Sequence, residues 1–478
     1  MTKARLDGLY MLLLGSVVFI LLGGVLEKVA PAPMSDFKAV YYGARCLIQH
    51  TDPYKNGEIL RVYQADGGQF PSDPIISRSV RRAVLVCINL PTSLFLVAPF
   101  AILPWGLAHV LWMILMCGSL IFAAFLMWDL GADFAPVIAG ALIGFVLANS
   151  EILVINGNAA GVVIGLCVVA VWCFLKRRFA VVGVLCLAIS LVFKPHDAGL
   201  VWLYFLLAGG VFRKRALQAL VVTIVLSLPA ILWVSEVAPH WMQELHSNLQ
   251  EISARGELND PGPSSTGAHT VIMVISLQSI FSLFRDDPRF YNPATYLLAG
   301  LPILLWIVVT LRSRFSTERA WLALAAISAL SMLPVYHRLY DAKLLLLAVP
   351  ACTMLWAEGG LIGWIALLVN TAGFVVTGDL PWVILSGLIR SLHLSLSGQT
   401  LIAVQAFPAP VILLVMGIFY LWVYASRSFG AARPTESGSP GEVHIAPALL
   451  DSGSNQKRAF SGMIPSLRIA SNLERGSR

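Results

Sequence analysis

The chain has 478 residues, of which 58% are hydrophobic and 12% are charged, and its mean hydropathy is +0.78. Soluble globular proteins carry about 25% charged residues, so this composition excludes a soluble globular protein and predicts an all-α polytopic membrane protein. The formal net charge is +7. The basic residues gather at the ends of apolar segments and in the C-terminal tail, which favours contact with membrane lipids over binding to nucleic acid.

The first apolar segment runs from Leu9 to Val29 and is long enough to cross a bilayer core of roughly 30 Å. It is too long for a signal peptide and lacks a small-residue cleavage site, so we interpret it as the first membrane helix. Residues 30–82 then form the predicted first external loop, which carries the first candidate for a functional residue.

That candidate is a lone carboxylate, Asp36, which follows the helix-ending prolines Pro31 and Pro33. Apolar and aromatic residues recur at helical spacing behind it and predict an amphipathic helix at the membrane surface. Asp36 could cap this helix or act as a general base at the membrane surface, and the residues alone leave both roles open. The helical stripe consists of Phe37, Val40, Tyr41, Ala44 and Leu47.

Further apolar segments predict a bundle of about 11–13 transmembrane helices within one domain, residues 1–425. The number of crossings must fit the side of the membrane on which each connecting loop is placed. This leaves segment 84–103 as one that does not cross fully, and it makes the short segment 271–284 a re-entrant or surface helix. Residues 426–478 are rich in Ser, Gly, Pro and charge and are predicted to be a disordered cytoplasmic tail. The apolar segments are 84–103, 105–128, 134–155, 179–193, 198–212, 216–237, 293–311, 320–333, 344–357, 361–376 and 401–424.

Basic clusters at segment ends orient the chain, because such clusters stay in the cytoplasm. The turn at Lys194 and the segment 335–343 then lie outside, together with the Asp36 loop. Three arginines between residues 78 and 82 would favour a cytoplasmic position for that loop, but a loop of about 50 residues is near the length at which the rule weakens. The cytoplasmic clusters are Lys176–Arg178, Arg213–Arg215, Arg312 with Arg314, and Arg427.

Four polar clusters therefore reach the same predicted face. Ionisable residues near membrane segments are costly and are functional candidates, although each could also be a satisfied loop residue. The clusters around Lys194 and His337 offer cations and N–H donors that could hold a phosphate. Asp341 could share that site or pair with Arg338 or Lys343. The clusters are Asp36; Asn156 with Asn158; Lys194, His196 and Asp197; and His337, Arg338, Asp341 and Lys343.

Sequence motifs for nucleotides and metals are missing: there is no Walker loop, no HExxH and no clustered Cys/His set. The seven cysteines lie mostly in apolar segments and are expected to be small core residues rather than ligands or disulfides. We therefore expect neither a metal site nor a cofactor.

The order of five motifs resembles the polyprenol-phosphate-mannose-dependent mannosyltransferases of glycosyltransferase family 87, over roughly residues 10 to 425. Two motifs depart from the family pattern: Asn156-Gly157-Asn158 lacks the glutamine of Gly-Gln-x-Asn, and Asn89-Leu90-Pro91 replaces Tyr-Pro-Pro. The motifs are Asp36 with YYGARCLIQHTDPY, NLPTSLFLVAPFAILPW, NGNAAGVVIGLCVVAVW, KRRFAVVGVLCLAISLVFKPHDAGLVWLYFLL and YHRLYDAKLLLLAVP.

The resemblance implies a GT-C membrane fold and an inverting transfer of a sugar from a polyprenyl-phosphate donor to a glycolipid or glycan acceptor. It places the protein in the cell membrane, with its active site on the extracytoplasmic side. It implies that Asp36 is the general base and that His337 and Lys194 contact the donor phosphate. The site expected from the resemblance and the polar clusters together has His196 and Arg338 also at the phosphate, and Asn156, Asn158, Asp341 and Tyr41 in the substrate cavity.

Two other functions stay open at this stage. A transporter or flippase for a lipid-linked sugar would place polar residues at mid-membrane depth and would show internal symmetry. A non-catalytic membrane subunit would use Asp36 only as a helix cap. Within the enzyme hypothesis, arabinose or glucose could replace mannose.

Overall fold

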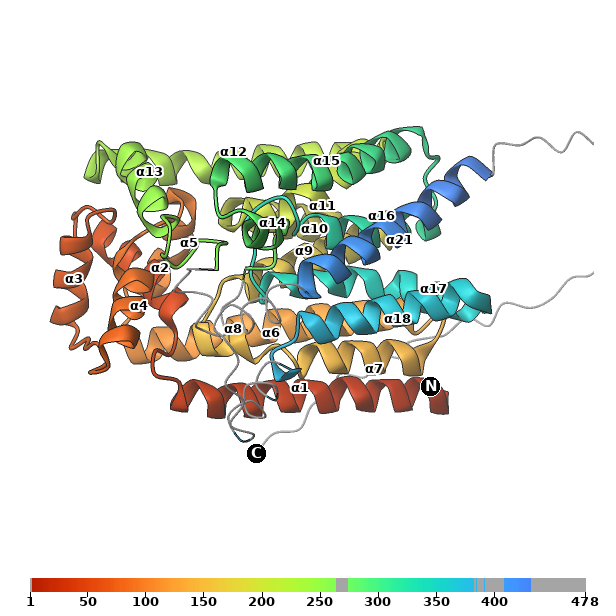
Figure 1. Ribbon diagram of the computed structural model, residues 1–478, viewed down its shortest axis with the longest axis horizontal. Coiled ribbons are helices and arrows are strands. Elements are labelled where there is room, and N and C mark those ends of the chain that lie inside the picture. The colour runs from red at the N-terminus through yellow and green to blue at the C-terminus, as the bar shows by residue number, and fades with distance from the viewer. Residues whose placement is uncertain (1, 264–273, 382–383, 385–390, 392–407, 431–478) are drawn as a thin grey trace, which may run out of the picture. The chain divides into compact units, whose positions relative to one another are not determined.

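The computed structural model describes residues 2–263, 274–381, 384, 391 and 408–430, and it is built of helices (Figure 1). Within these residues, six segments are helical, long and apolar enough to cross a membrane, which confirms an all-α polytopic membrane protein. Residues Met1–Ala432 form one compact unit, and the predicted tail beyond residue 430 lies outside the described residues. The six segments are α1 (Lys3–Val29), α6 (Trp105–Gly131), α7–α8 (Pro136–Asn156), α12 (Gly210–Val237), α15 (Pro288–Arg312) and α21 (Pro408–Gly430).

The other expected spans are shorter helices, many of them started by a proline or ended at a glycine. Segment 84–103 is reduced to α5, and residues 277–284 of the short segment 271–284 form α14, while 271–273 lie outside the described residues. The total of 11–13 membrane crossings therefore stays a prediction. The long segment Pro136–Asn156 consists of α7 (Pro136–Leu147) and α8 (Glu151–Asn156). The remaining shorter helices, including those of the first predicted loop, are α2 (Ser35–Ile48), α3 (Asn56–Ala65), α4 (Pro74–Leu85), α5 (Pro91–Ala101), α9 (Ala160–Leu175), α10 (Ala180–Phe193), α11 (Pro195–Leu207), α13 (Trp241–Ile252), α14 (Leu277–Phe284), α16 (Thr317–Leu330), the 3-10 helix η2 (Asp341–Ala348), α17 (Val349–Glu358) and α18 (Gly360–Val376).

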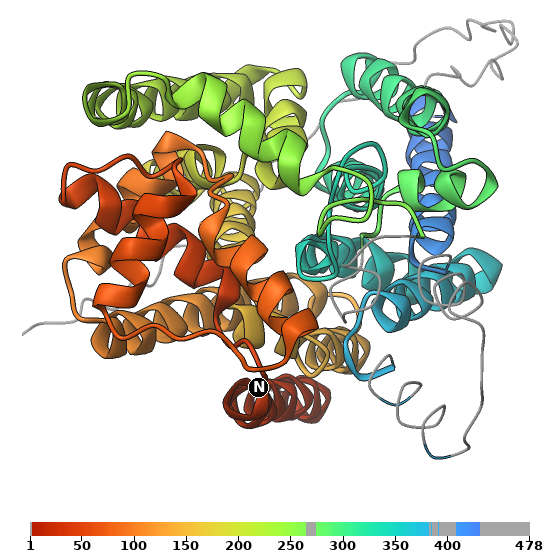
Figure 2. The same cartoon turned by 60° about the vertical axis from the view of Figure 1, so that its left-hand side comes forward.

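The chain runs across the compact unit from one side to the other. Figure 2 shows the molecule turned by 60°. In this view the orange helices of the N-terminal part lie on the left, and the cyan and blue helices of the C-terminal part lie on the right. Helices α9 and α11, from the middle of the chain, contact the later helices η2 and α16. This packing brings polar turns from distant parts of the sequence to one place.

Helix α1 packs along α7 (Figure 1), and glycines set the distance between them. A Cβ atom on Gly144 would lie 2.4 Å from the carbonyl oxygen of Met11, and a Cβ atom on Gly15 would lie 2.2 Å from that of Gly144. No side chain fits at these distances, as is typical of close helix pairs in membranes. The interface holds the first membrane helix, and with it the start of α2, against the bundle.

The aromatic residues of α2 are packed inside the protein. Phe37 and Tyr41 are fully buried. Phe37 stacks on Trp112 of α6 with ring centroids 4.6 Å apart, and Tyr41 meets Trp105 edge to face at 5.2 Å. The helix predicted behind Asp36 is confirmed. The expected position of its aromatic stripe on the membrane surface is wrong, because the stripe is buried inside the protein, where α5 packs along α2 and α6 supplies Trp105 and Trp112.

Lys343 lies in a buried junction of helix ends. Its Nζ donates to the carbonyl oxygens of Asn149, at 2.5 Å, and Thr377, at 3.2 Å, beyond the C-terminal ends of α7 and α18. Asp379 accepts a hydrogen bond of 2.6 Å from the backbone N–H of Ile152 in the first turn of α8. Lys343 therefore ties helices together and does not pair with Asp341.

We predict that Gly144→Leu lowers the free energy of unfolding by at least about 1–3 kcal/mol, the usual cost of overpacking. The new side chain would collide with the backbone of α1 and push the two helices apart. Thermal unfolding in detergent would measure the change.

Gly118→Leu on α6 is the matched control, because no atom lies within 4 Å of the Cβ position of Gly118. Equal stability of the two variants would contradict the close α1–α7 interface.

Candidate active site

A cavity of about 670 Å³ lies where α2, the turn between α10 and α11, and the loop before η2 meet. These segments are far apart in the sequence, so the cavity exists only in the folded chain. The predicted site residues that line it are Asp36, Asn158, Lys194, His196, Arg338 and Asp341.

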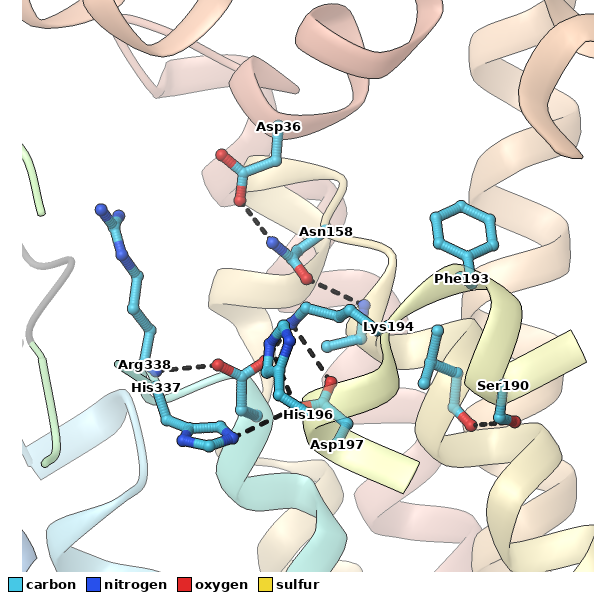
Figure 3. A network of polar contacts seen from close by, with 12 residues as sticks. Asp36, Asn158, Ser190, Phe193, Lys194, His196, Asp197, His337 and Arg338 are labelled. Atoms are coloured by element: carbon cyan, nitrogen blue, oxygen red, sulfur yellow. Dashed lines mark hydrogen bonds and ion pairs between the residues drawn. The ribbon is translucent and has the colours of Figure 1, made fainter. Parts of the chain in front are cut away.

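Asp36 is held by one well-defined hydrogen bond (Figure 3). Its Oδ2 accepts from Nδ2 of Asn158 at 2.6 Å. The orientation of that amide is fixed, because Oδ1 of Asn158 accepts from the backbone N–H of Ala160 at 2.8 Å. Met34 occupies the N-cap position of α2. The Asp36 side chain therefore belongs to the cavity and does not act as the helix cap.

Burial raises the pKa of Asp36 above its usual value of 3.8. The positive charge of Arg338, the hydrogen bond from Asn158 and the positive charge of Lys194 oppose this rise. A carboxylate with a raised pKa is a stronger base, because its charged form is less well solvated than in water.

Lys194 lies in the turn between α10 and α11 and is bound by two carboxylates. Its Nζ donates to Oδ1 of Asp341 and lies 3.2 Å from Oδ2 of Asp197. Both carboxylates are only 2% exposed. Burial alone would lower the pKa of Lys194, but Asp197 and Asp341 raise it above its usual value. Lys194 therefore stays charged at the edge of the cavity.

The side chain of Asp341 does not form its ion pair with Arg338 or Lys343, the two partners proposed from the sequence. Lys343 lies in the helix junction described above, and Arg338 contributes only its backbone N–H, at 2.8 Å from Oδ2 of Asp341. The side-chain partner is Lys194. The sequence could not indicate this pair, because its members are 147 positions apart.

His196 and His337 contact each other and the same oxygen of Asp197. The Nε2 atom of each ring is 3.6 Å from Oδ1 of Asp197, and the ring centroids are 5.1 Å apart. The His196 side chain is 39% exposed and that of His337 only 2%. His337 is not among the residues that line the cavity, and burial lowers its pKa.

These three residues could also hold a metal ion. The ligand atoms of His196, Asp197 and His337 lie within 4.8 Å of one another, and two imidazoles with one carboxylate form a ligand set used by divalent metals. Asp197 also pairs with Lys194, whose positive charge opposes a bound cation. The spacing in the sequence gave no indication of this cluster.

Arg338 forms part of the cavity wall. Its guanidinium donates to the hydroxyl of Tyr336 and to Oδ1 of Asn259, the latter at 2.8 Å. The backbone of Arg338 pairs with Val274 in an isolated antiparallel bridge. These contacts fix the side chain where a negatively charged ligand in the cavity can approach it.

Two expected cavity residues lie elsewhere. The Tyr41 hydroxyl donates to the carbonyl oxygen of Leu103 at 2.8 Å, and its ring is part of the aromatic core. Asn156 is buried at the end of α8 and does not line the cavity. Gly157, with φ of 63°, reverses the chain in a conformation that suits glycine. As a result, Asn158 reaches Asp36 instead.

Two residues gained roles that sequence reasoning had not assigned. Asp197 contacts Lys194 and both histidines. Its position in Lys194-Pro195-His196-Asp197 could have indicated the contacts with Lys194 and His196, but not the one with His337. Asn259 holds Arg338 from a loop 79 positions earlier, and no local pattern marks it. The complete arrangement joins one carboxylate base to several cations, which suits uptake of a proton and stabilisation of a phosphate.

The sequence model of a protein family, glycosyltransferase family 87, matches residues 88–336, just over half of the 478 residues. The match includes Asn158, Lys194 and His196, while Asp36 precedes it and His337 follows it directly. No curated protein matches the chain.

We predict that Lys194→Met lowers the free energy of unfolding by about 3–5 kcal/mol, the cost of leaving a buried ion pair without one partner. Two buried carboxylates would then face each other without a cation. Thermal unfolding in detergent would measure the loss.

Lys55→Met is the matched control, because Lys55 forms its 3.2 Å ion pair with Asp52 at the surface, with 61% of its side chain exposed. Its effect should be far smaller. A similar loss in both variants would contradict a structural role for the buried pair.

Proposed function

Because the chain belongs to glycosyltransferase family 87 and is therefore a membrane glycosyltransferase, we propose that it transfers a mannosyl group from a polyprenyl-phosphate donor to a glycolipid or glycan acceptor. The transfer inverts the anomeric configuration and uses Asp36 as general base. The observation that carries this proposal is that Asp36 and the charged Lys194 line one cavity.

The base step follows from the geometry of Asp36. In a single displacement, the acceptor hydroxyl attacks the anomeric carbon and gives up its proton in the same step. Oδ2 of Asp36 accepts the short bond of 2.6 Å from Asn158, while Oδ1 accepts only a long bond of 3.5 Å from the hydroxyl of Ser35, so Oδ1 is the oxygen that takes that proton. The raised pKa of Asp36 strengthens it as a base, and one carboxylate suffices for such a displacement.

The leaving group is a phosphate, which needs positive charge and N–H donors but no proton. Lys194, His196 and Arg338 line the cavity and can supply them. His337 touches Asp197 and His196 but does not line the cavity, so we assign it a positioning role behind His196. Asp197 and Asp341 keep Lys194 charged and in place.

The proposed active site opens on the extracytoplasmic side of the cell membrane. The basic clusters of the sequence support this orientation, because they place the Asp36 loop and the Lys194 turn on that side. The donor's lipid chain would stay among the membrane helices while its sugar and phosphate enter the cavity.

We predict that Asp36→Asn reduces the rate of transfer by about 100- to 10,000-fold, the usual contribution of a positioned base. Asparagine keeps the shape of the side chain and can still contact Asn158, but it cannot take up the proton. The measurement is transfer of radiolabel by the purified protein from polyprenyl-phosphate mannose, with the arabinose and glucose donors assayed in parallel.

Asp52→Asn is the control in the same external loop, since its side chain accepts the 2.9 Å bond from the backbone N–H of Tyr54 and an asparagine can do the same. Full activity of Asp36→Asn would overturn the assigned base. Transfer from another donor with mannose inert would overturn only the choice of sugar.

We predict that Asn158→Leu shifts the acidic limb of the pH–rate profile to higher pH. Asn158 donates to the charged form of Asp36 and thereby lowers its pKa, so loss of that bond raises the pKa further. Activity requires the deprotonated carboxylate and therefore falls off sooner as the pH decreases. An unchanged acidic limb in a variant that keeps its thermal stability would show that Asn158 does not act on the base.

A further inference from the structure

Several buried oxygen atoms in the helix junction around Lys343 have no hydrogen-bond donor. They belong to Asn149, Glu151 and Asp379, each of which is at most 4% exposed. Oδ1 of Asn149, both carboxylate oxygens of Glu151 and Oδ1 of Asp379 accept no hydrogen bond from another residue. Such atoms are rare in folded proteins and indicate a bound water or ion. We call the three residues the junction cluster.

The fold brings the junction cluster together from two parts of the chain. Oδ2 of Asp379, its other carboxylate oxygen, accepts from the backbone N–H of Ile152, the residue after Glu151, at 2.6 Å. Oδ1 of Asn149 lies 2.8 Å from the position that a Cβ atom on the neighbouring Gly378 would take. The free oxygens therefore lie where the connection between α7 and α8 meets the segment after α18.

The atoms that the junction cluster offers are all acceptors. The orientation of the Asn149 amide is fixed, because its Nδ2 donates to the carbonyl oxygen of Phe145 at 2.8 Å, so its oxygen is the atom left over. Lys343 donates to backbone carbonyl oxygens and, in the part of the chain that the structure describes, forms no ion pair with either carboxylate. Carboxylate and amide oxygens are the usual ligands of hard cations.

Charge at the junction favours a cation over water. Glu151 lies in Pro136–Asn156, which is long and apolar enough to cross a membrane, and a buried charge there is costly unless it is compensated. Asp379 and Lys343 are near enough to act on the charge of Glu151. Two carboxylates and one ammonium leave one excess negative charge. Water could donate to the free oxygens but would not neutralise that charge, whereas one monovalent cation would do so.

We propose that the junction cluster is a binding site for a monovalent metal cation, Na⁺ or K⁺, and that this ion holds the start of α8 in place. The three residues do not line the active-site cavity, so the ion is a structural support and takes no part in transfer. Helix α8 ends two residues before Asn158, which donates to Asp36. The ion therefore stabilises the segment that presents this amide, and the inference holds whatever the protein transfers.

Thermal unfolding and ion binding test the proposal without any transfer activity. The purified full-length protein in detergent is unfolded in NaCl, KCl or choline chloride at one pH and one ionic strength. We expect the midpoint to rise with Na⁺ or K⁺, by about 1–3 °C for each tenfold increase above the dissociation constant, and not with choline. Equilibrium binding of radioactive sodium should saturate at a single ion per chain.

Glu151→Gln is the informative variant, because it keeps the shape of the side chain and removes the excess charge. We expect it to lose sodium binding and the effect of Na⁺ on the midpoint, and to be at least as stable as the wild type in choline. Glu27→Gln on α1 is the matched control. The Glu27 side chain is 13% exposed but already has a partner, with Oε1 3.5 Å from Nε2 of His109, so this variant should still respond to Na⁺.

Three results would overturn the proposal. Equal midpoints in sodium, potassium and choline, together with no sodium binding, would assign the excess charge to a proton on Glu151. An unchanged response to Na⁺ in Glu151→Gln would place the ion elsewhere. A larger rise with Ca²⁺ than with Na⁺ at equal ionic strength would make the site one for divalent cations. If Glu151→Gln does not fold, the ion series and sodium binding of the wild type still decide.

Discussion

The candidate active site depends on the buried ion pair between Lys194 and Asp341. It joins the turn between α10 and α11 to the start of η2, and it brings together residues 147 positions apart. Asp341 also fixes the backbone N–H of Arg338 at 2.8 Å. Asp197, the second carboxylate on Lys194, lies 3.6 Å from the Nε2 atom of each histidine. A buried pair of this kind adds little net stability but is costly to break. Its main effect is to position the cations around the cavity.

The proposed base depends on a different constraint, the packing of α1 on α7. Helix α1 leads into α2 and Asp36, while α7 leads into α8 and Asn158, so the glycine interface near Gly144 sets both partners of one hydrogen bond. The backbone N–H of Met34 donates to the carbonyl oxygen of Ile155 at 2.6 Å, which ties the two chain segments together directly before the site. A shift of α1 would therefore move the base away from the amide that orients it.

The sequence predicted the fold class and the helix behind Asp36, and six of its nine predicted site residues line the cavity, because hydropathy and the cost of charge near a membrane act locally along the chain. It did not predict what depends on tertiary contacts. Tyr41 has the same helical spacing whether α6 or lipid covers it, and only the fold shows that Trp105 lies against it. Asp341 has cations on both sides in the sequence, yet its side-chain partner comes from another turn.

The charges around the cavity explain how a single base can serve the proposed transfer. Burial and the neighbouring Asp341 raise the pKa of Asp197 to about 7. Above that pH, three charged carboxylates and two cations leave one excess negative charge, and the donor phosphodiester adds another. Burial and the neighbouring Lys194 lower the pKa of His196 in the free protein, while a phosphate beside its ring would act in the opposite direction and favour its protonation. During transfer the departing phosphate gains one negative charge and Asp36 gains one proton, so the total charge of the site is unchanged. The charged groups are Asp36, Asp197, Asp341, Lys194 and Arg338.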